Sequence, residues 1–138
     1  MTNDRGKVAY LFPGQGAQAV GMGKDIYDSS EDAKSVFTEA DSSLEFSLSD
    51  LCFNGPEETL TQTVNTQPAI LTVSIAMLRA GQNILNAKFP QPSFVAGHSL
   101  GEYSALVASG VLTFEEAVRL VRARGQLMQH AGDLETGA

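Results

Sequence analysis

Cysteine and positive charge are both scarce in this sequence, and it has no long apolar run. Cys52 is the single cysteine, which excludes a disulfide framework and is typical of a reducing compartment, so cytoplasm is the expected location. Nine Lys and Arg face sixteen Asp and Glu, for a formal net charge of -7, which argues against nucleic acid as a partner. The run Val8–Phe12 is too short for a signal peptide and Ala69–Leu78 is too short to span a bilayer, so no membrane association is expected.

What the sequence does contain is sufficient apolar material for a core. Of its 138 residues, 43% are apolar and 18% are charged. A chain of this length and composition buries a core without disulfides. It is therefore expected to be one ordinary folded domain or a large piece of one.

Two short runs rich in β-forming residues predict parallel strands. Lys7–Phe12 ends at Pro13-Gly14, and Ser93–Ala96 runs into Gly97. The connection between them is long enough for a parallel crossover, which predicts an α/β fold. Two strands make a poor sheet, so the chain is expected to be part of a larger α/β unit.

Periodic apolar residues and capping residues predict the helices. Ser29, with Asp32 three residues on, resembles a capping box that opens the first of them, and Asn65–Pro68 predicts a break before the second. The predicted helices are Ala33–Leu44, Ala69–Asn86, Tyr103–Ser109 and Phe114–His130, with a further helix start at Pro56–Glu58. Thr113 is the predicted cap of the last helix, and residues 132–138 are predicted to be a linker.

Residues 97–101 match the G-x-S-x-G turn of serine nucleophiles, between a predicted strand and a predicted helix. A sharp turn pushes the Ser99 hydroxyl out of the sheet, and side chains at Gly97 and Gly101 would collide there. The following helix points its positive end at the site, where the backbone N–H of Leu100 can hold an oxyanion. We therefore predict that Ser99 is a nucleophile; the alternative is a strand-to-helix turn that happens to contain serine.

A base that would activate this serine is not evident. His98 is adjacent to Ser99, but neighbouring residues on a tight turn point apart, so we interpret His98 as a positioning or structural residue. His130 is the other histidine, and it falls on the solvent face of the last predicted helix. Either the base lies outside these residues or this chain is inactive alone.

One cation of the last predicted helix falls on its apolar face. Arg124 lies near the centre of that stripe, whereas Arg119 and Arg122 lie opposite. The stripe consists of Ala117, Leu120, Val121, Leu127, Met128 and Ala131. A buried guanidinium stays charged, and its planar fork matches a carboxylate. Three interpretations are open: an internal Asp or Glu partner, a head group that reaches solvent, or a ligand carboxylate.

The glycine-rich segment 13–23 is predicted to be a loop, and it fits no phosphate-binding motif. Ala19 stands where a dinucleotide fingerprint needs its third glycine, and Met22 stands where a P-loop needs lysine. Gln15 follows the first strand, where its amide can face the serine turn and supply a second oxyanion donor. Ordinary turn chemistry is the alternative for this residue.

Four stretches together resemble one family. FPGQGAQAVGMG, NTQPAI, AGHSLGEYSALVASGVL and VRLVRARGQLMQ are similar to the malonyl-CoA:acyl carrier protein transacylases, a family that includes the acyltransferase domains of fatty acid and polyketide synthases. The resemblance runs from Val8 over essentially the whole chain. It implies an α/β-hydrolase-like large subdomain with parallel strands, a small inserted ferredoxin-like subdomain, and no metal or redox cofactor.

The resemblance also implies a role for each candidate residue. Ser99 matches the serine that takes malonyl from coenzyme A and passes it to the phosphopantetheine thiol of acyl carrier protein. Gln15 and the N–H of Leu100 match the oxyanion hole, and Arg124 matches the arginine that pairs with the malonyl carboxylate. Three further residues are expected to support or line the pocket: His98, Gln67 and Met128.

Family members are longer than this chain, and their catalytic histidine lies in a part that is absent here. Residues 1–138 are therefore expected to be the N-terminal portion of a transacylase, without the inserted subdomain and the C-terminal part. Three hypotheses follow. The first is malonyl transfer in fatty acid biosynthesis, with malonyl-CoA, acyl carrier protein and a complementary C-terminal chain as partners. The second is a serine hydrolase that delivers the acyl group to water, and the third is an inactive fragment that acts only by binding.

Overall fold

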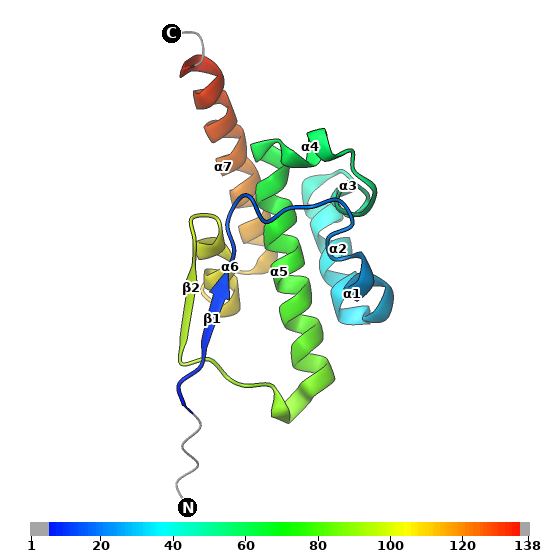
Figure 1. The fold of residues 1–138 in the computed structure, drawn as a ribbon, viewed down its shortest axis with the longest axis vertical. Helices are drawn as coiled ribbons and strands as arrows, with labels where there is room; N and C mark the ends of the chain where they lie inside the picture. Colours follow the sequence, from blue (N-terminus) through cyan, green and yellow to red (C-terminus); the bar gives the residue numbers. More distant parts are fainter. Residues whose placement is uncertain (1–5, 136–138) are drawn as a thin grey trace, which may run out of the picture.

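The computed structural model describes residues 6–135, which form an α/β arrangement of helices against a small sheet (Figure 1). The two strands, β1 (Ala9–Phe12) and β2 (Phe94–Gly97), are parallel, which confirms the predicted fold class. The helices are α1 (Lys24–Ser29), α2 (Glu31–Leu44), α3 (Leu48–Asn54), α4 (Glu57–Thr61), α5 (Thr63–Leu85), the 3-10 turn η1 (Asn86–Lys88), α6 (Gly101–Ala108) and α7 (Phe114–Glu135). Within the described range, none of these helices is long and apolar enough to cross a membrane.

The register of the sheet brings two loops to the same edge. Phe12 pairs with Gly97, and these are the last residues of β1 and β2. Because both strands end at this edge, the glycine-rich loop 13–23 leaves the sheet beside the serine turn, and this edge positions the candidate site. Both strands begin slightly later than predicted.

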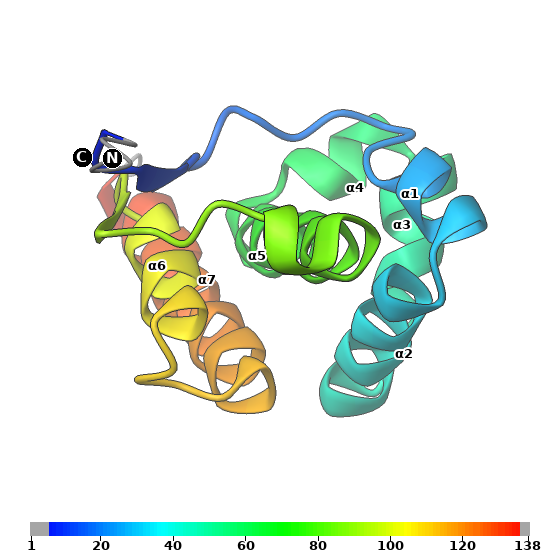
Figure 2. The ribbon, with the colours of Figure 1, turned by 90° about the horizontal axis from the view of Figure 1, so that it is seen from below.

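The long helix α5 lies at the centre of the core, between α2 on one side and the pair α6 and α7 on the other (Figure 2). The predicted break at Asn65–Pro68 is wrong, because α5 begins at Thr63 and contains Pro68. A proline inside a helix leaves the carbonyl four residues earlier without its N–H partner. Here that carbonyl, on Val64, accepts a hydrogen bond from Arg122 Nη1 at 2.9 Å. The guanidinium replaces the missing backbone donor and ties α5 to α7.

The close approach of α7 to α5 depends on a glycine. A β-carbon built on Gly125 would lie 2.8 Å from Val64 Cα and 2.9 Å from Thr63 O, so any side chain there would separate the two helices. The face of α7 that is buried against the core consists of Phe114, Ala117, Val118, Val121 and Gly125.

The predicted apolar stripe of α7 is wrong in its later turns. The stripe residues that the structure leaves exposed are Leu120, Leu127, Met128 and Ala131. For Leu127, Met128 and Ala131 the reason is that α5 begins beside Gly125, so this part of α7 projects past α5 without a covering helix (Figure 1). Arg122, predicted on the solvent face, is half-buried over the Phe46 ring, and burial lowers the pKa of its guanidinium. The predicted linker is helical over residues 132–135, and residues 136–138 lie outside the described range.

Two helix starts test the predicted caps. Thr113 Oγ1 accepts from the Glu116 N–H at 3.2 Å, and the Glu116 carboxylate accepts from the Thr113 N–H at 2.9 Å, which confirms Thr113 as the cap of α7. The carboxylate accepts from the Thr113 N–H and also from Thr113 Oγ1, at 2.8 Å, and these two bonds favour its ionised form and lower the pKa of Glu116. The capping residue predicted for α2 is wrong: Ser30, not Ser29, accepts from the Ala33 N–H, at 3.3 Å.

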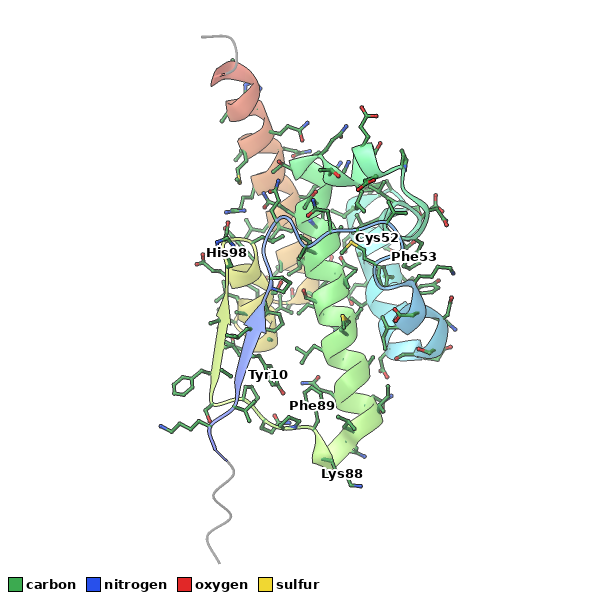
Figure 3. All side chains as sticks on the ribbon, viewed as in Figure 1. Tyr10, Cys52, Phe53, Lys88, Phe89 and His98 are labelled. Carbon is green, nitrogen blue, oxygen red and sulfur yellow. The ribbon has the colours of Figure 1, made fainter. Side chains whose placement is uncertain are left out.

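The short helices α1 and α3, which the sequence did not indicate, enclose an aromatic cluster. The rings of Tyr27 and Phe37 each lie 5.0 Å from Phe53, in tilted arrangements that favour aromatic contact. Cys52, beside this cluster (Figure 3), is buried, and desolvation raises the pKa of its thiol to about 12. The thiol is therefore protonated and unreactive at neutral pH.

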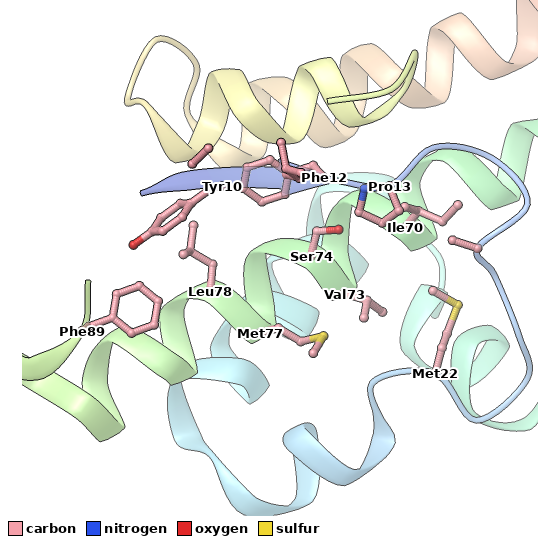
Figure 4. A pocket seen from close by; sticks show the side chains of 13 residues that line it. Tyr10, Phe12, Pro13, Met22, Ile70, Val73, Ser74, Met77, Leu78 and Phe89 are labelled. Carbon is pink, nitrogen blue, oxygen red and sulfur yellow. The ribbon is translucent and has the colours of Figure 1, made fainter. Parts of the chain in front are cut away.

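An apolar cavity of about 610 Å³ lies between β1 and α5 (Figure 4). Tyr10, Met77 and Phe89 contribute to its walls. Neither Ser99 nor Arg124 lines it. The cavity therefore lies in the gap between β1 and α5 and does not include the serine turn.

We expect Gly125→Ala to destabilise the chain by about 1–3 kcal/mol, because the added methyl group overlaps the backbone of Val64 and forces α7 away from α5. Urea denaturation followed by circular dichroism measures this change. Gly132→Ala is the matched control in the same helix, since a β-carbon there meets nothing within 4 Å. That substitution is expected to stabilise by up to about 1 kcal/mol through helix propensity. Equal effects of the two substitutions would contradict the close approach.

Candidate active site

The serine turn holds Ser99 in a strained backbone conformation. Ser99 has φ +52°, a left-handed value that costs energy for a residue with a β-carbon. A β-carbon on Gly97 would lie 1.9 Å from the carbonyl carbon of Gly101, and one on Gly101 would lie 2.3 Å from Phe12 O. Only glycine fits at both positions, so the chain reverses sharply between β2 and α6 and leaves the Ser99 side chain exposed.

Two backbone N–H groups near this turn are unengaged. Within residues 6–135, the N–H groups of Leu100 and Gln15 have no hydrogen-bond partner. Leu100 stands at the N-terminus of α6, where the helix dipole favours negative charge. Gly14 brings the second loop close, because a β-carbon there would lie 2.5 Å from His98 O. Both N–H groups are thus available to an anion at the edge of the sheet.

The side chain of Gln15 does not face the serine turn, as the sequence had suggested it would. Its Nε2 donates to Thr63 Oγ1 at 3.1 Å, at the first residue of α5. This contact anchors the glycine-rich loop on α5. The backbone N–H, and not the side-chain amide, is therefore the group of Gln15 that is left for an oxyanion.

Arg124 reaches Ser99 from α7. Its Nη2 donates to Ser99 Oγ at 3.1 Å, and its Nη1 donates to Gln67 Oε1 at 2.7 Å. The guanidinium also lies 5.5 Å from the centre of the Tyr103 ring, which is within the range of a cation–π contact. Arg124 is half-buried, and no carboxylate in the described part of the chain forms an ion pair with it. The internal Asp or Glu partner considered for this arginine is thus absent from that part.

Gln67 holds the Arg124 guanidinium by accepting the hydrogen bond from Nη1. Its side chain is fully buried in α5, and its Nε2 donates to Met128 Sδ at 3.2 Å. Because the amide nitrogen is engaged by Met128, the amide oxygen is directed at Arg124. The structure therefore joins four of the predicted residues in one chain of contacts, from Met128 through Gln67 and Arg124 to Ser99.

Neither histidine contacts Ser99. His98 lies at the end of β2 (Figure 3) with its Nδ1 against Gly14, and its ring makes no hydrogen bond within the described residues. His130 is exposed on α7. Arg124 is the only described hydrogen-bond partner of the Ser99 side chain, so no base is in position there. The same residues include no group of His, Cys, Asp and Glu that could hold a metal ion.

Sequence reasoning missed Tyr103 and Thr63. Tyr103 lies four residues after Ser99, in the first turn of α6, and this spacing could have placed its ring near the nucleophile. Thr63 could not have been predicted, because Pro68 indicated a break in the helix and the predicted start of α5 was therefore too late. Both residues fix other members of the site and do not contact Ser99 by any described hydrogen bond.

A parallel strand, a strained serine and a helix N-terminus together define an α/β protein with a G-x-S-x-G turn between β2 and α6. Residues 9–137 match the acyl transferase domain family, and the chain belongs to that family. It is 52% identical over 136 residues to a malonyl CoA-acyl carrier protein transacylase of Bacillus subtilis (strain 168), covering 96% of this chain and 40% of that protein.

Solved structures agree with this assignment. The fold is similar to that of an acyl carrier protein S-malonyltransferase from Vibrio cholerae, with a TM-score of 0.85 and 49% identity, over 91% of this chain and 40% of that one. It is also similar to a malonyl-transacylase in complex with its type II PKS acyl-carrier protein, with a TM-score of 0.81 and 45% identity, over 91% and 40% of the two chains. The chain thus spans about 40% of the length of these relatives.

Gln67→Leu is expected to destabilise the chain by about 1–3 kcal/mol, because it removes only one partner of a hydrogen bond and leaves the half-buried Arg124 Nη1 without its acceptor. It removes the acceptor of Arg124 Nη1, so the Arg124 guanidinium should become more mobile. Hydrogen exchange and ¹⁵N relaxation of Arg124 Nε measure that mobility, and Arg119 of the same helix, paired with Glu115, is the internal reference. An unchanged Arg124 signal would show that Gln67 does not hold the guanidinium.

Proposed function

We propose that this chain carries the nucleophile and the acyl-binding half of a malonyl transferase. In this proposal the complete protein moves malonyl from coenzyme A to the phosphopantetheine thiol of acyl carrier protein in fatty acid synthesis, through an acyl-serine at Ser99. Residues 1–138 are then part of an α/β-hydrolase-like large subdomain. The transacylases and the carrier-protein complex to which the chain is similar support this proposal.

The contact between Arg124 and Ser99 carries the argument. In a malonyl thioester, the carboxylate stands only one methylene group away from the carbonyl that the nucleophile attacks. A cation that binds this carboxylate must therefore lie within a few ångström of the nucleophilic oxygen, and Arg124 Nη2 lies 3.1 Å from Ser99 Oγ. A longer diacid would need a larger separation between nucleophile and cation.

The chemistry has two symmetrical halves. Ser99 Oγ attacks the thioester carbonyl while a base takes its proton, the N–H groups of Leu100 and Gln15 hold the oxyanion, and coenzyme A leaves as a thiol after receiving that proton. The carrier-protein thiol then attacks the acyl-serine, its proton passes to the base, and Ser99 recovers a proton as it leaves. Arg124 holds the malonyl carboxylate throughout.

The base comes, in this proposal, from polypeptide outside these 138 residues. An exposed stripe on α7 supports this, because Leu120, Leu127 and Leu134 recur every seven residues on the face that also carries Arg124. Exposed leucines at that spacing are typical of a packing surface. A segment that packs there lies beside Ser99 and can bring a histidine to it.

Malonyl-CoA is expected to label Ser99 only when the missing portion is supplied. The 138-residue chain should give no adduct by intact-protein mass spectrometry, because no base contacts Ser99 within residues 6–135. Mixing it with the remaining portion of the Bacillus subtilis relative should restore the adduct, and Ser99→Ala should abolish it. An adduct that survives Ser99→Ala would reject the nucleophile. Release of the acyl group to water as readily as to carrier-protein thiol would favour the hydrolase hypothesis.

Arg124→Ala is expected to slow malonyl transfer in the completed protein by about 30- to 100-fold, because it removes the charged partner of the substrate carboxylate. Acetyl transfer should change much less, since an acetyl group has no carboxylate. Rates of Ser99 acylation by malonyl-CoA and acetyl-CoA measure the two effects. Arg119→Ala, also on α7, is the control and should leave both rates unchanged; equal losses in Arg124→Ala would contradict the carboxylate role.

A further inference from the structure

The Arg124 guanidinium is already occupied in the free chain, and its partners among the described residues are all neutral. Nη1 donates to the amide oxygen of Gln67, Nη2 donates to the hydroxyl oxygen of Ser99, and the Tyr103 ring lies beside the cation. The guanidinium bonds to Gln67 and Ser99 have neutral acceptors, whereas a carboxylate adds a full opposite charge and can accept two parallel bonds from the planar fork. A carboxylate therefore has a strong advantage in competing for this cation.

The two hydrogen-bonded partners are not equally easy to displace. Gln67 is fully buried and is also held by Met128 Sδ at 3.2 Å, so its oxygen cannot withdraw without disturbing the core. Ser99 is exposed, and its bond to Nη2 is the longer of the two, at 3.1 Å against 2.7 Å. An incoming carboxylate is thus expected to replace Ser99 and to leave Gln67 in place.

The bond from Arg124 also affects the nucleophile. Attack on a carbonyl uses a lone pair of Ser99 Oγ, and in the free chain a lone pair of that oxygen accepts the Nη2 hydrogen. An uncharged acyl group has no carboxylate that could replace the Ser99 hydroxyl as acceptor of the Nη2 hydrogen bond.

We propose that Arg124 masks Ser99 in the empty site and that a carboxylate-bearing acyl group unmasks it by taking the guanidinium for itself. This inference rests on the proposed function and adds a second level of selectivity to it. The carboxylate then acts twice, once by binding and once by releasing the nucleophile that attacks the same substrate.

Ligand binding to the 138-residue chain tests the competition without any catalysis. The probe is malonamate, which has one carboxylate and one uncharged carbonyl, and the matched control ligand is malonamide, which has no carboxylate. Titrations are followed by NMR at the Arg124 guanidinium and at Ser99 Cβ. In the parent chain we expect both signals to move together with malonamate and neither to move with malonamide.

Ser99→Ala is expected to bind malonamate about 3- to 10-fold more tightly than the parent chain, because the internal competitor for the guanidinium is gone. Ser99→Cys, whose sulfur is a weaker acceptor, should fall between the two. Ser93→Ala is the control, since Ser93 is exposed and its side chain makes no described hydrogen bond, and it should bind as the parent does. The ¹H–¹⁵N spectrum of each variant shows that the fold is retained.

Equal or weaker binding by Ser99→Ala and Ser99→Cys would overturn the masking, because hydroxyl and carboxylate would then share the guanidinium. If Arg124→Ala abolishes malonamate binding in that case, the carboxylate role in the proposed function stands and only the masking fails. Absence of saturable malonamate binding in the parent chain and in both Ser99 variants would overturn the masking and the carboxylate role together.

Discussion

The packing of α7 on α5 determines where the cation of this site can lie. Gly125 lets the two backbones approach, and one residue earlier the chain projects Arg124 toward the serine turn. Arg122 reinforces the same junction by donating to the Val64 carbonyl that Pro68 leaves unpaired. The contact between Arg124 and Ser99 therefore depends on backbone geometry at a helix crossing, and not on the arginine side chain alone.

The serine turn depends on a different constraint, the steric crowding among β1, β2 and α6. Gly97 and Gly101 allow the turn to close against the carbonyl of Phe12, and this crowding holds Ser99 at a positive φ. The strain is local and is compensated by the surrounding strand pairing and helix packing. Ser99 and Arg124 are thus positioned by independent parts of the fold that meet at one sheet edge.

Local patterns predicted the parts of this site that are local in the chain. The serine turn, the Thr113 cap and the two strand segments follow from residues that are close in sequence, and all three are present. Prediction failed where distant segments decide the outcome. The start of α5 was missed because Arg122 compensates for Pro68 from another helix, and the side chain of Gln15 turns to Thr63, which only the tertiary fold brings near.

The helical wheel of α7 illustrates how a residue can be singled out correctly for an incomplete reason. It marked Arg124 as a cation that needs a partner, but it assumed that the whole apolar stripe was buried, whereas Leu127 is 72% exposed. The partners of Arg124 in the structure are neutral groups and not a carboxylate. A half-buried cation with only neutral partners retains most of its capacity to bind an anion, because no internal negative charge has to be displaced. This separates the arginine from one held in a structural ion pair, and it leaves the guanidinium beside Ser99 able to bind an anion.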